Sequence, residues 1–367
     1  MKMIEMHIVQ SFPVTCLNRD DLGSPKSAVF GGVERARVSS QCWKRAIRSS
    51  AKELLPGNFA GNRTRYIIEK LEKSIESKGQ KENARTLAVS LADALGKIDS
   101  IENGNVKTML YLSPMEIENI SSAILGMEYS GPVETLKKTD LKGKEKEKAE
   151  KELLKLTERA AKAMKENVKD AADIALFGRM VADDHSLTLE GTSNFSHAIS
   201  THKVSSEIDF FSAVDDLKPE DTEGAGHIGT LEFNSACYYR YVGINLDLFR
   251  DKDHLNHFST DERKKVLDAF IRACLMANPT ARKNSMFGYS FPSYVLGLRR
   301  TGQPLSLANA FEKPIFSHDG YEKKSEEKLK EYFEFMKKTW NISTDVKTEI
   351  PTLGIDKFIE SLLNSEV

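Results

Sequence analysis

The sequence has few of the features that mark disulfide-bonded, secreted or membrane-spanning proteins. Its 367 residues include only four cysteines, and Cys16, Cys42, Cys237 and Cys274 lie far apart. Because no two of them form a C-x-x-C pair, neither a disulfide framework nor a cysteine zinc site is indicated. No apolar run approaches the roughly 18 residues that span a bilayer, and the N-terminus lacks the apolar core of a secretory signal. We therefore expect a soluble, cytoplasmic protein without a membrane partner.

The chain has almost no net charge, but its acidic and basic residues are concentrated in different segments. The formal net charge is -1. Residues 1–50 nevertheless carry eight Lys or Arg against four acidic residues, whereas residues 205–223 carry seven acidic residues against one Lys. Since local charge decides contact with a polyanion, the first segment favours nucleic-acid binding and the second disfavours it. The length allows two domains, or one domain with large insertions.

The first 55 residues predict a strand, a loop and a helix. Apolar and polar residues alternate over 1–10, which is typical of a strand with one buried face. Residues 16–32 are rich in Asn, Asp, Gly, Ser and Pro and end in two glycines, a pattern that indicates a loop with a sharp turn. A short strand is expected over 35–38, and the following serines, Ser39 and Ser40, can cap a helix that runs to residue 55.

This helix has one polar, basic face and one apolar face. Residues at helical spacing form the first face, which we expect to point outward: Gln41, Lys44, Arg45 and Arg48. The second face is expected to pack on a core and consists of Trp43, Ala46, Ile47 and Leu54. Guanidinium and ammonium groups beside a helix N-terminus suit phosphate and sugar oxygens, so these residues favour a nucleic-acid contact.

The rest of the chain predicts a long helical insertion followed by further strands and helices. Residues 60–180 form this insertion, in which helices are expected around 64–78, 83–96, 114–126 and 144–177. Residues 205–233 predict a protruding hairpin before a strand over 236–248. A capping box at 259–262 begins another helix, and strand-like residues follow within 286–298. The order suits an α+β, ferredoxin-like or RRM-like core that is interrupted by the insertion.

Two short motifs match ligand-binding patterns without their structural context. Residues 224–229 read G-x-G-x-x-G, but no strand is predicted before them and no helix after them, so we interpret them as a loop tip rather than a dinucleotide site. The pairs His254 with His257 and His197 with His202 lack a companion Cys or acidic cluster at ligand spacing. We interpret these histidines as structural and expect no metal site and no cofactor.

Catalytic patterns are also weak. No Gly-x-Ser-x-Gly elbow is present, and no cysteine lies in a catalytic signature. Asp20 and Asp21 are the best acidic candidates, because adjacent carboxylates in a loop can hold Mg²⁺ near a phosphodiester. The alternative for these residues is a local turn or an ion pair with Arg19. A magnesium-dependent ribonuclease that uses Asp20 or Asp21 therefore stays open beside the non-catalytic interpretation.

Several motifs in one order resemble the CasC (Cse-type) backbone subunit of the type I-E CRISPR Cascade effector complex, over essentially the whole chain. In the N-terminal part they occupy residues 16–21, 28–32, 37–41 and 44–46. In the later part they occupy residues 173–180, 197–202, 211–216 and 308–313. The resemblance implies a non-catalytic, crRNA-binding protein of antiviral defence, which polymerises along the guide RNA as a helical filament and presents the spacer for pairing with target DNA. The implied partners are crRNA, target DNA through the crRNA, other copies of the chain and other Cascade subunits.

The resemblance also implies a hand-like fold and a set of RNA-binding residues. An RRM-like palm would occupy 1–59, 181–204 and 236–367, with a helical finger lobe over 60–180 and a β-hairpin thumb over 205–235. The residues implied to hold crRNA phosphates and riboses are Arg19, Lys26, Ser39, Gln41, Lys44, Arg45 and Arg48. Met180 would lie where a neighbouring subunit's thumb kinks the RNA.

Overall fold

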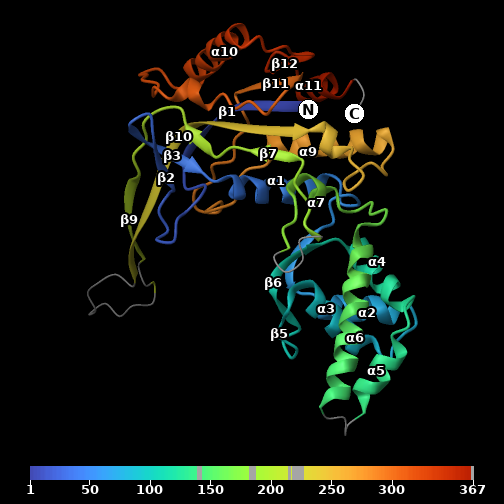
Figure 1. Cartoon of the computed structure of the whole chain (residues 1–367). Coiled ribbons are helices and arrows are strands. Elements are labelled where there is room, and N and C mark those ends of the chain that lie inside the picture. The colour runs from blue at the N-terminus through green and yellow to red at the C-terminus, as the bar shows by residue number, and fades with distance from the viewer. Residues whose placement is uncertain (139–142, 182–186, 214–215, 217–226, 365–367) are drawn as a thin grey trace, which may run out of the picture. The chain divides into compact units, whose positions relative to one another are not determined.

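The computed structural model describes residues 1–138, 143–181, 187–213, 216 and 227–364, and the chain divides into two compact units (Figure 1). The first unit consists of residues 1–54, 193–247 and 267–367. The second consists of residues 55–192 and 248–266. Each unit contains helices and antiparallel strands, so the predicted α+β class is confirmed.

The first unit is built on one sheet whose neighbouring strands are antiparallel. Its strands are β1 (Lys2–Thr15), β2 (Ser27–Phe30), β3 (Val33–Val38), β7 (Ser193–Phe195), β8 (Ala198–Ser200), β9 (Glu207–Ala213), β10 (His227–Asn245), β11 (Tyr294–Thr301) and β12 (Val346–Ile350). The order across the sheet is β12-β11-β1-β10-β8-β3-β2, and β7 and β9 also pair with β10. Gly31 and Gly32 have positive φ between β2 and β3, which provides the expected sharp turn.

The strand β1 is buried on both faces, which corrects the prediction of a half-buried strand. It lies between β10 and β11, and its polar residues Glu5 and His7 are fully buried. Tyr241 donates a hydrogen bond to Glu5 at 2.8 Å, and His7 Nδ1 lies 3.0 Å from the Tyr239 hydroxyl. Burial lowers the pKa of His7 to about 3, so this side chain stays neutral. The alternation of apolar and polar residues along β1 therefore separates two buried faces of the sheet, not a buried face from a solvent-exposed face.

Helices cover both faces of this sheet (Figure 1). They are α1 (Ser40–Leu54), α10 (Glu322–Thr339), α11 (Ile355–Leu363) and the 3₁₀ turn η3 (Ala308–Phe311). The helix α1 buries Trp43, Ile47 and Ala51 at i, i+4 and i+8, whereas Leu54, which we expected to be buried, is 46% exposed at the helix end. The helices α8 (Leu246–Phe249) and α9 (Thr260–Met276) contain residues of both units.

The strands β9 and β10 form the antiparallel hairpin that the acidic segment predicted. Opposite residues include Ile208 with Glu232 and Phe210 with Thr230. The tip, with residues 214–215 and 217–226, lies outside the described residues, so the glycines of the G-x-G-x-x-G motif at 224 and 226 are not described. The third glycine, Gly229, lies within β10, where a strand replaces the helix that a dinucleotide site requires.

The second unit contains more strand than we predicted. Its helices are α2 (Ile68–Ser77), α3 (Ala84–Gly96), α4 (Pro114–Leu125), α5 (Ser130–Lys137), α6 (Lys144–Ala161), η1 (Lys162–Lys165) and α7 (Ala172–Phe177). Its strands β4 (Asn62–Tyr66), β5 (Ile98–Ser100) and β6 (Asn105–Leu112) form a separate sheet in the order β4-β6-β5. The sequence did not reveal this sheet, because two of its strands are short and its pairing partners lie up to about fifty residues apart. The helices α2 to α6 and η1 pack on a common apolar core with β6, and Ile174 of α7 packs in a separate cluster with Tyr111 and Val168.

Candidate nucleic-acid interface

The N-terminus of α1 is fixed by a serine cap and by the loop before it. Ser39 Oγ accepts a hydrogen bond from the Cys42 N–H at 3.3 Å, which satisfies one of the free donors of the first turn. The Ser39 N–H donates to Asn18 Oδ1 at 2.9 Å, so the loop and the helix start are held together. The prediction that Ser39 caps this helix is confirmed. Its side chain is 7% exposed, and its oxygen is engaged in the cap.

The other predicted RNA-binding residues of the first unit surround this helix start. Arg19, Gln41 and Arg45 are exposed, and Lys26, Lys44 and Arg48 are partly buried. The Lys44 ammonium lies 5.2 Å from the centre of the Phe195 ring in β7, a cation–π contact that orients the side chain. Whether these residues bind RNA stays a prediction. The structure places all of them on α1 or on the loop before it.

Lys26 and Arg45 share an electrostatic neighbourhood although they lie nineteen positions apart in the sequence. Both act on the thiol of Cys42 in the first turn of α1. Burial raises the pKa of Cys42 to about 11, and the two cations oppose this rise. The thiol donates to the Leu17 carbonyl at 3.6 Å, so Cys42 is a neutral packing residue here. The cations from the loop and from the helix therefore converge near the first turn.

The loop from Cys16 to Lys26 is organised by Asp20. One oxygen, Asp20 Oδ1, accepts the N–H groups of Leu22 and Ser24, each at 2.9 Å. The Asp20 N–H also donates to the Ser24 carbonyl at 2.9 Å. This arrangement is an Asx-type turn, so the structural interpretation of Asp20 is confirmed. The Asp20 carboxylate therefore stabilises the loop that carries Arg19 and Lys26.

A groove of about 1030 Å³ lies beside this loop in the first unit. Arg19 from the loop, Arg45 from α1 and Arg282 from the segment after α9 line it. Asp21 and Glu53 line it as well, so its charge is mixed. Arg282 has a positive φ of 51°, which is uncommon for a residue with a Cβ atom. No sequence pattern indicated Arg282, because only the fold brings this residue to the groove.

An arginine–histidine pair on the same unit was not among the predicted RNA-binding residues. Arg37 Nη1 lies 3.1 Å from His197 Nδ1, and Arg37 Nε donates to the Ser27 carbonyl at 3.2 Å. Arg37 is partly buried and His197 is exposed. The two residues are 160 positions apart and meet because β3 pairs with β8. Spacing along the chain contains no signal for such a pair.

The remaining candidate histidines make structural contacts with distant parts of the chain. His254 Nε2 lies 2.8 Å from the Glu190 carbonyl, and His257 Nε2 lies 2.8 Å from the Val168 carbonyl. His202 is buried, accepts the Cys237 N–H at 3.2 Å and stacks on Tyr321. The structural interpretation of these residues is thus supported by their contacts. Over residues 1–364, gaps excluded, no group of three or more His, Cys, Asp or Glu side chains could hold a metal ion.

The described helices also include none that is both long and apolar enough to cross a membrane.

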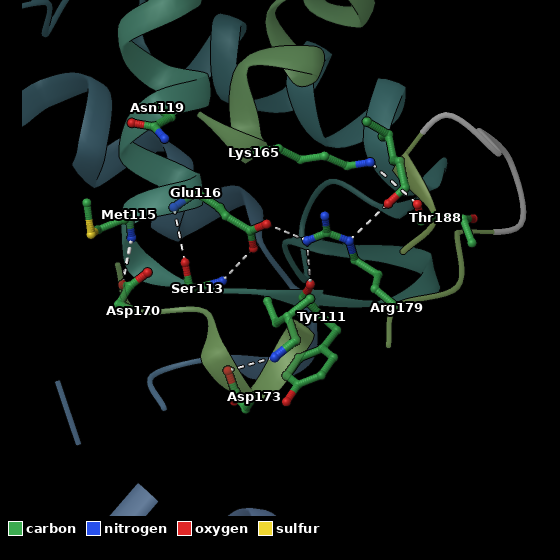
Figure 2. A network of polar contacts seen from close by, with 12 residues as sticks. Tyr111, Ser113, Met115, Glu116, Asn119, Lys165, Asp170, Asp173, Arg179 and Thr188 are labelled. Carbon is green, nitrogen blue, oxygen red and sulfur yellow. Dashed lines mark hydrogen bonds and ion pairs between the residues drawn. The ribbon is translucent and has the colours of Figure 1, made fainter. Parts of the chain in front are cut away.

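Met180 lies in the second unit, directly after a buried arginine. Its side chain is 77% exposed, whereas Arg179 is 4% exposed. Arg179 pairs with Glu116 at 2.6 Å and donates to the carbonyls of Tyr111 at 3.2 Å and Leu187 at 3.1 Å (Figure 2). The backbone of Arg179 also exchanges two hydrogen bonds of 2.8 Å with Leu189. These contacts fix the backbone that presents Met180 to its surroundings.

Glu116 connects this arginine to the start of α4. One oxygen accepts the Ser113 N–H at 2.9 Å while Ser113 Oγ accepts the Glu116 N–H at 3.2 Å (Figure 2), which is a capping box. Burial raises the pKa of Glu116, and the Arg179 guanidinium opposes that rise. The second oxygen accepts from Arg179, so both oxygens are satisfied. A buried pair of this kind depends on such hydrogen bonds, and on the arginine side Nη2 of Arg179 is buried without one among the described residues.

The β9–β10 hairpin presents apolar side chains to its surroundings. Ile208, Phe210 and Ile228 are 70%, 66% and 55% exposed. Their register places them on one face, because residues opposite each other in an antiparallel pair share a face. On the other face, Phe211 covers Gly229, where a Cβ atom would meet its ring at 2.6 Å. An exposed apolar face of this kind is typical of an interaction surface.

Comparisons with known proteins agree over nearly the whole chain. The model of a family described as "CT1975-like protein" matches residues 4–356. One chain of a solved "CRISPR RNA-guided surveillance complex, pre-nicking" is 28% identical, with a TM-score of 0.80, and the match covers 98% of this chain and 100% of that chain. A chain of a second solved "CRISPR RNA-guided surveillance complex" is 23% identical, with a TM-score of 0.61 and coverage of 99% and 98%, and shows a similar fold. Among curated proteins, none matches this sequence.

Proposed function

The chain belongs to the CT1975-like family of CasC-type backbone subunits of CRISPR RNA-guided surveillance complexes, and on this premise we propose that its copies grip the guide RNA through the surface around α1. The family is one of non-catalytic, crRNA-binding subunits, and the chain is therefore part of a complex with crRNA and other Cascade subunits. The single observation that carries the proposal is the convergence of loop and helix cations at the capped N-terminus of α1.

The proposed contact is to the ribose-phosphate backbone. Arg19, Lys26, Lys44, Arg45 and Arg48 supply positive charge, and Gln41 supplies an amide beside them. Phosphate contacts position a nucleic acid without reading its sequence. A subunit that must accept any guide needs this property, because base pairing with the target reads the sequence. Ser39 acts in this proposal through the helix start, whose N–H groups favour an anion.

The proposed anatomy is an RRM-like palm, a helical finger lobe and a hairpin thumb. The strand order β11-β1-β10-β8, with α1 after β1 and α9 after β10, supports the palm, since it is the order of a ferredoxin-like core. The β9–β10 hairpin supports the thumb and the second unit supports the finger lobe. In this proposal the palm consists of 1–59, 181–204 and 236–367, the finger lobe of 60–180 and the thumb of 205–235.

Copies of the chain are proposed to form a helical filament along the RNA. The exposed face of Ile208, Phe210 and Ile228 supports a contact between the hairpin and the next copy. Met180, which is exposed on a fixed backbone, is proposed to contact the RNA where that hairpin kinks it, because a flexible thioether adapts to any base. A head-to-tail contact of this kind does not close on itself and gives an open helix. Target DNA would then pair with the displayed guide, in the cytoplasm.

The ribonuclease alternative is set aside. The family is non-catalytic, and Asp20 is the acceptor of an Asx-type turn. Incubation of the purified chain with labelled RNA and Mg²⁺, beside Asp20→Ala, checks this conclusion, and we expect no cleavage by either protein.

The proposed interface is tested by charge reversal on α1. We expect the double variant Lys44→Glu with Arg48→Glu to bind single-stranded RNA about 100-fold more weakly than the wild type, since about two phosphate contacts are lost and replaced by repulsion. The slope of log affinity against log salt should be about -3 for the wild type, from about four phosphates, and shallower by about 1.4 for the variant.

A matched control is available on the exposed surface of α10. Lys337→Glu with Lys338→Glu makes the same change in net charge in the same unit, and we expect it to leave the affinity within about threefold, because long-range charge is screened at physiological salt. Equal losses in both double variants would contradict a localised interface and indicate a general charge effect.

A further inference from the structure

The pair of Arg37 and His197 is the strongest feature of the first unit that the family motifs did not assign to RNA. Arg37 lies in β3, and His197 directly precedes β8, which pairs with β3. The Arg37 N–H is also bonded to the Lys26 carbonyl at 2.9 Å, and the Lys26 N–H to the Asn18 carbonyl at 2.9 Å. Since Asn18 accepts from Ser39, this chain of contacts joins the pair to the capped start of α1.

The charged groups that act on His197 in the described structure are both cations. They are Arg37 of β3 and Lys26 of the preceding loop. Partial burial is the largest cause that lowers the pKa of His197, and the two cations lower it further. A guanidinium N–H 3.1 Å from Nδ1 requires a lone pair on that nitrogen. The free protein therefore holds His197 as a neutral imidazole that accepts from Arg37.

We propose that Lys26, Arg37 and His197 form a phosphate-binding site for the guide RNA, and that His197 takes up a proton when the phosphate binds. This inference rests on the proposed function and adds two residues to it. The site lies on the exposed surface: His197 is exposed, and Arg37 and Lys26 are partly buried. Its ligand is a phosphodiester, because Arg37 and His197 are in contact, the Arg37 N–H is bonded to the Lys26 carbonyl, and the charges that act on the imidazole are both cations.

A bound phosphate would reduce the positive charge beside His197. Two cations make an imidazolium unfavourable in the free protein, and a bound phosphate neutralises them and favours it. Protonation of Nδ1 also ends its role as an acceptor, so the Arg37 Nη1 donor becomes available to the phosphate. A charge-assisted bond from an imidazolium and one from a guanidinium then replace a single neutral acceptor. In the free protein the Arg37 Nη1 donor is thus bonded to His197, and RNA binding makes it available to the phosphate.

The sign of the pH dependence follows from this order of pKa values. Because the pKa of His197 is lowered in the free protein and raised by the bound phosphate, RNA binding is accompanied by proton uptake. The affinity is full at a pH below the free-state pKa and decreases as the pH rises through the bound-state pKa. One linked proton changes the affinity by at most about tenfold per pH unit.

The experiment measures binding of the full chain to a fluorescein-labelled single-stranded RNA by anisotropy, at constant ionic strength, from about pH 5.5 to about pH 8. We expect wild-type affinity to decrease by at least about threefold over this range. His197→Gln, which cannot gain a proton, should lose that dependence. His318→Gln changes an exposed histidine elsewhere in the same unit and should keep it.

Arg37→Gln provides an independent measurement. Loss of one phosphate contact should make the slope of log affinity against log salt shallower by about 0.7 for single-stranded RNA. If the wild type binds RNA and His197→Gln retains its full pH dependence, the proton uptake is wrong and the proposed function stands. An unchanged salt slope in Arg37→Gln would contradict the proposed phosphate-binding site itself. If the wild type fails to bind RNA at low salt, the proposed function fails together with this inference.

Discussion

Arginine has opposite surroundings at two places in the molecule, at Arg179 of the second unit and around the start of α1 in the first. In the second unit, Arg179 is buried and its contacts include a carboxylate and two carbonyl oxygens of the same chain. In the first unit, Arg19 and Arg45 are exposed around the start of α1, where no ion pair of either residue occurs among the described ranges. A guanidinium is thus paired within the chain at Arg179 and, in our proposal, binds an external anion at Arg19 and Arg45.

Structural and functional cations differ in their burial and in their partners within the chain. A buried cation must find its partners within the chain, because an unpaired buried charge is strongly unfavourable. An exposed cation stays hydrated without a partner and is free to bind a phosphate. Burial and internal partners, rather than residue type, therefore distinguish Arg179 from Arg45.

The largest effect is expected from Arg179→Met. Its removal leaves Glu116 buried without its partner, and loss of one member of a buried pair costs about 3–5 kcal/mol. We expect amide hydrogen exchange to increase in β6 and α4, which hold Tyr111 and Glu116, while the strands of the first unit keep their protection. The control is Lys73→Met, whose pair with Glu69 is exposed on α2 and should contribute little to stability, because solvent screens it.

Equal protection in Arg179→Met and Lys73→Met would contradict the comparison, because it would mean that the completed buried pair matters no more than a surface pair.

A smaller, pH-dependent effect is expected from Glu262 at the start of α9. Its carboxylate accepts from Lys169 and from the Ser259 N–H, in the predicted capping box. These bonds, first that with Lys169, lower the pKa of Glu262 from 4.5 to about 2. Its contribution to stability is therefore present above pH 4.5 and is lost as the pH falls through about 2.

The measurement is the difference in hydrogen exchange at the start of α9 between wild type and Glu262→Gln. This difference should decrease as the pH is lowered from 4.5 toward 2, because the protonated glutamate then resembles glutamine. A difference that persists unchanged to the lowest pH at which the protein stays folded would show that the charge of Glu262 is irrelevant to the cap.

Local patterns predicted the elements that depend on neighbouring residues. The helix α1 was expected to begin at Ser39 or Ser40 and to end near residue 55, and it spans Ser40–Leu54 with Ser39 as its cap. The turn at Asp20 and the capping box before α9 were also predicted. Each depends on contacts within four residues, where propensity and capping chemistry act directly.

The features that the sequence did not reveal depend on distant contacts. The strand β1 lies inside the sheet because β10 and β11, more than 200 positions away, pair with its two edges, and helices from other parts of the chain cover the two faces of that sheet (Figure 1). Glu116 and Arg179 are 63 positions apart, and Arg37 and His197 are 160 apart. Only tertiary structure brings such residues together, so the buried network and the Arg37–His197 pair required the fold. The resemblance to a family supplied the function that local patterns left open.

The central claim is that the surface around α1 holds the guide RNA regardless of its sequence. The direct test is lysine-specific chemical footprinting by mass spectrometry, with and without each of two unrelated guide RNAs. We predict that both RNAs protect Lys26 and Lys44 to the same degree, while Lys337 and Lys338 on α10 react equally in all samples. Unchanged reactivity of Lys26 and Lys44 in the RNA-bound protein, or protection by only one guide, would contradict the account.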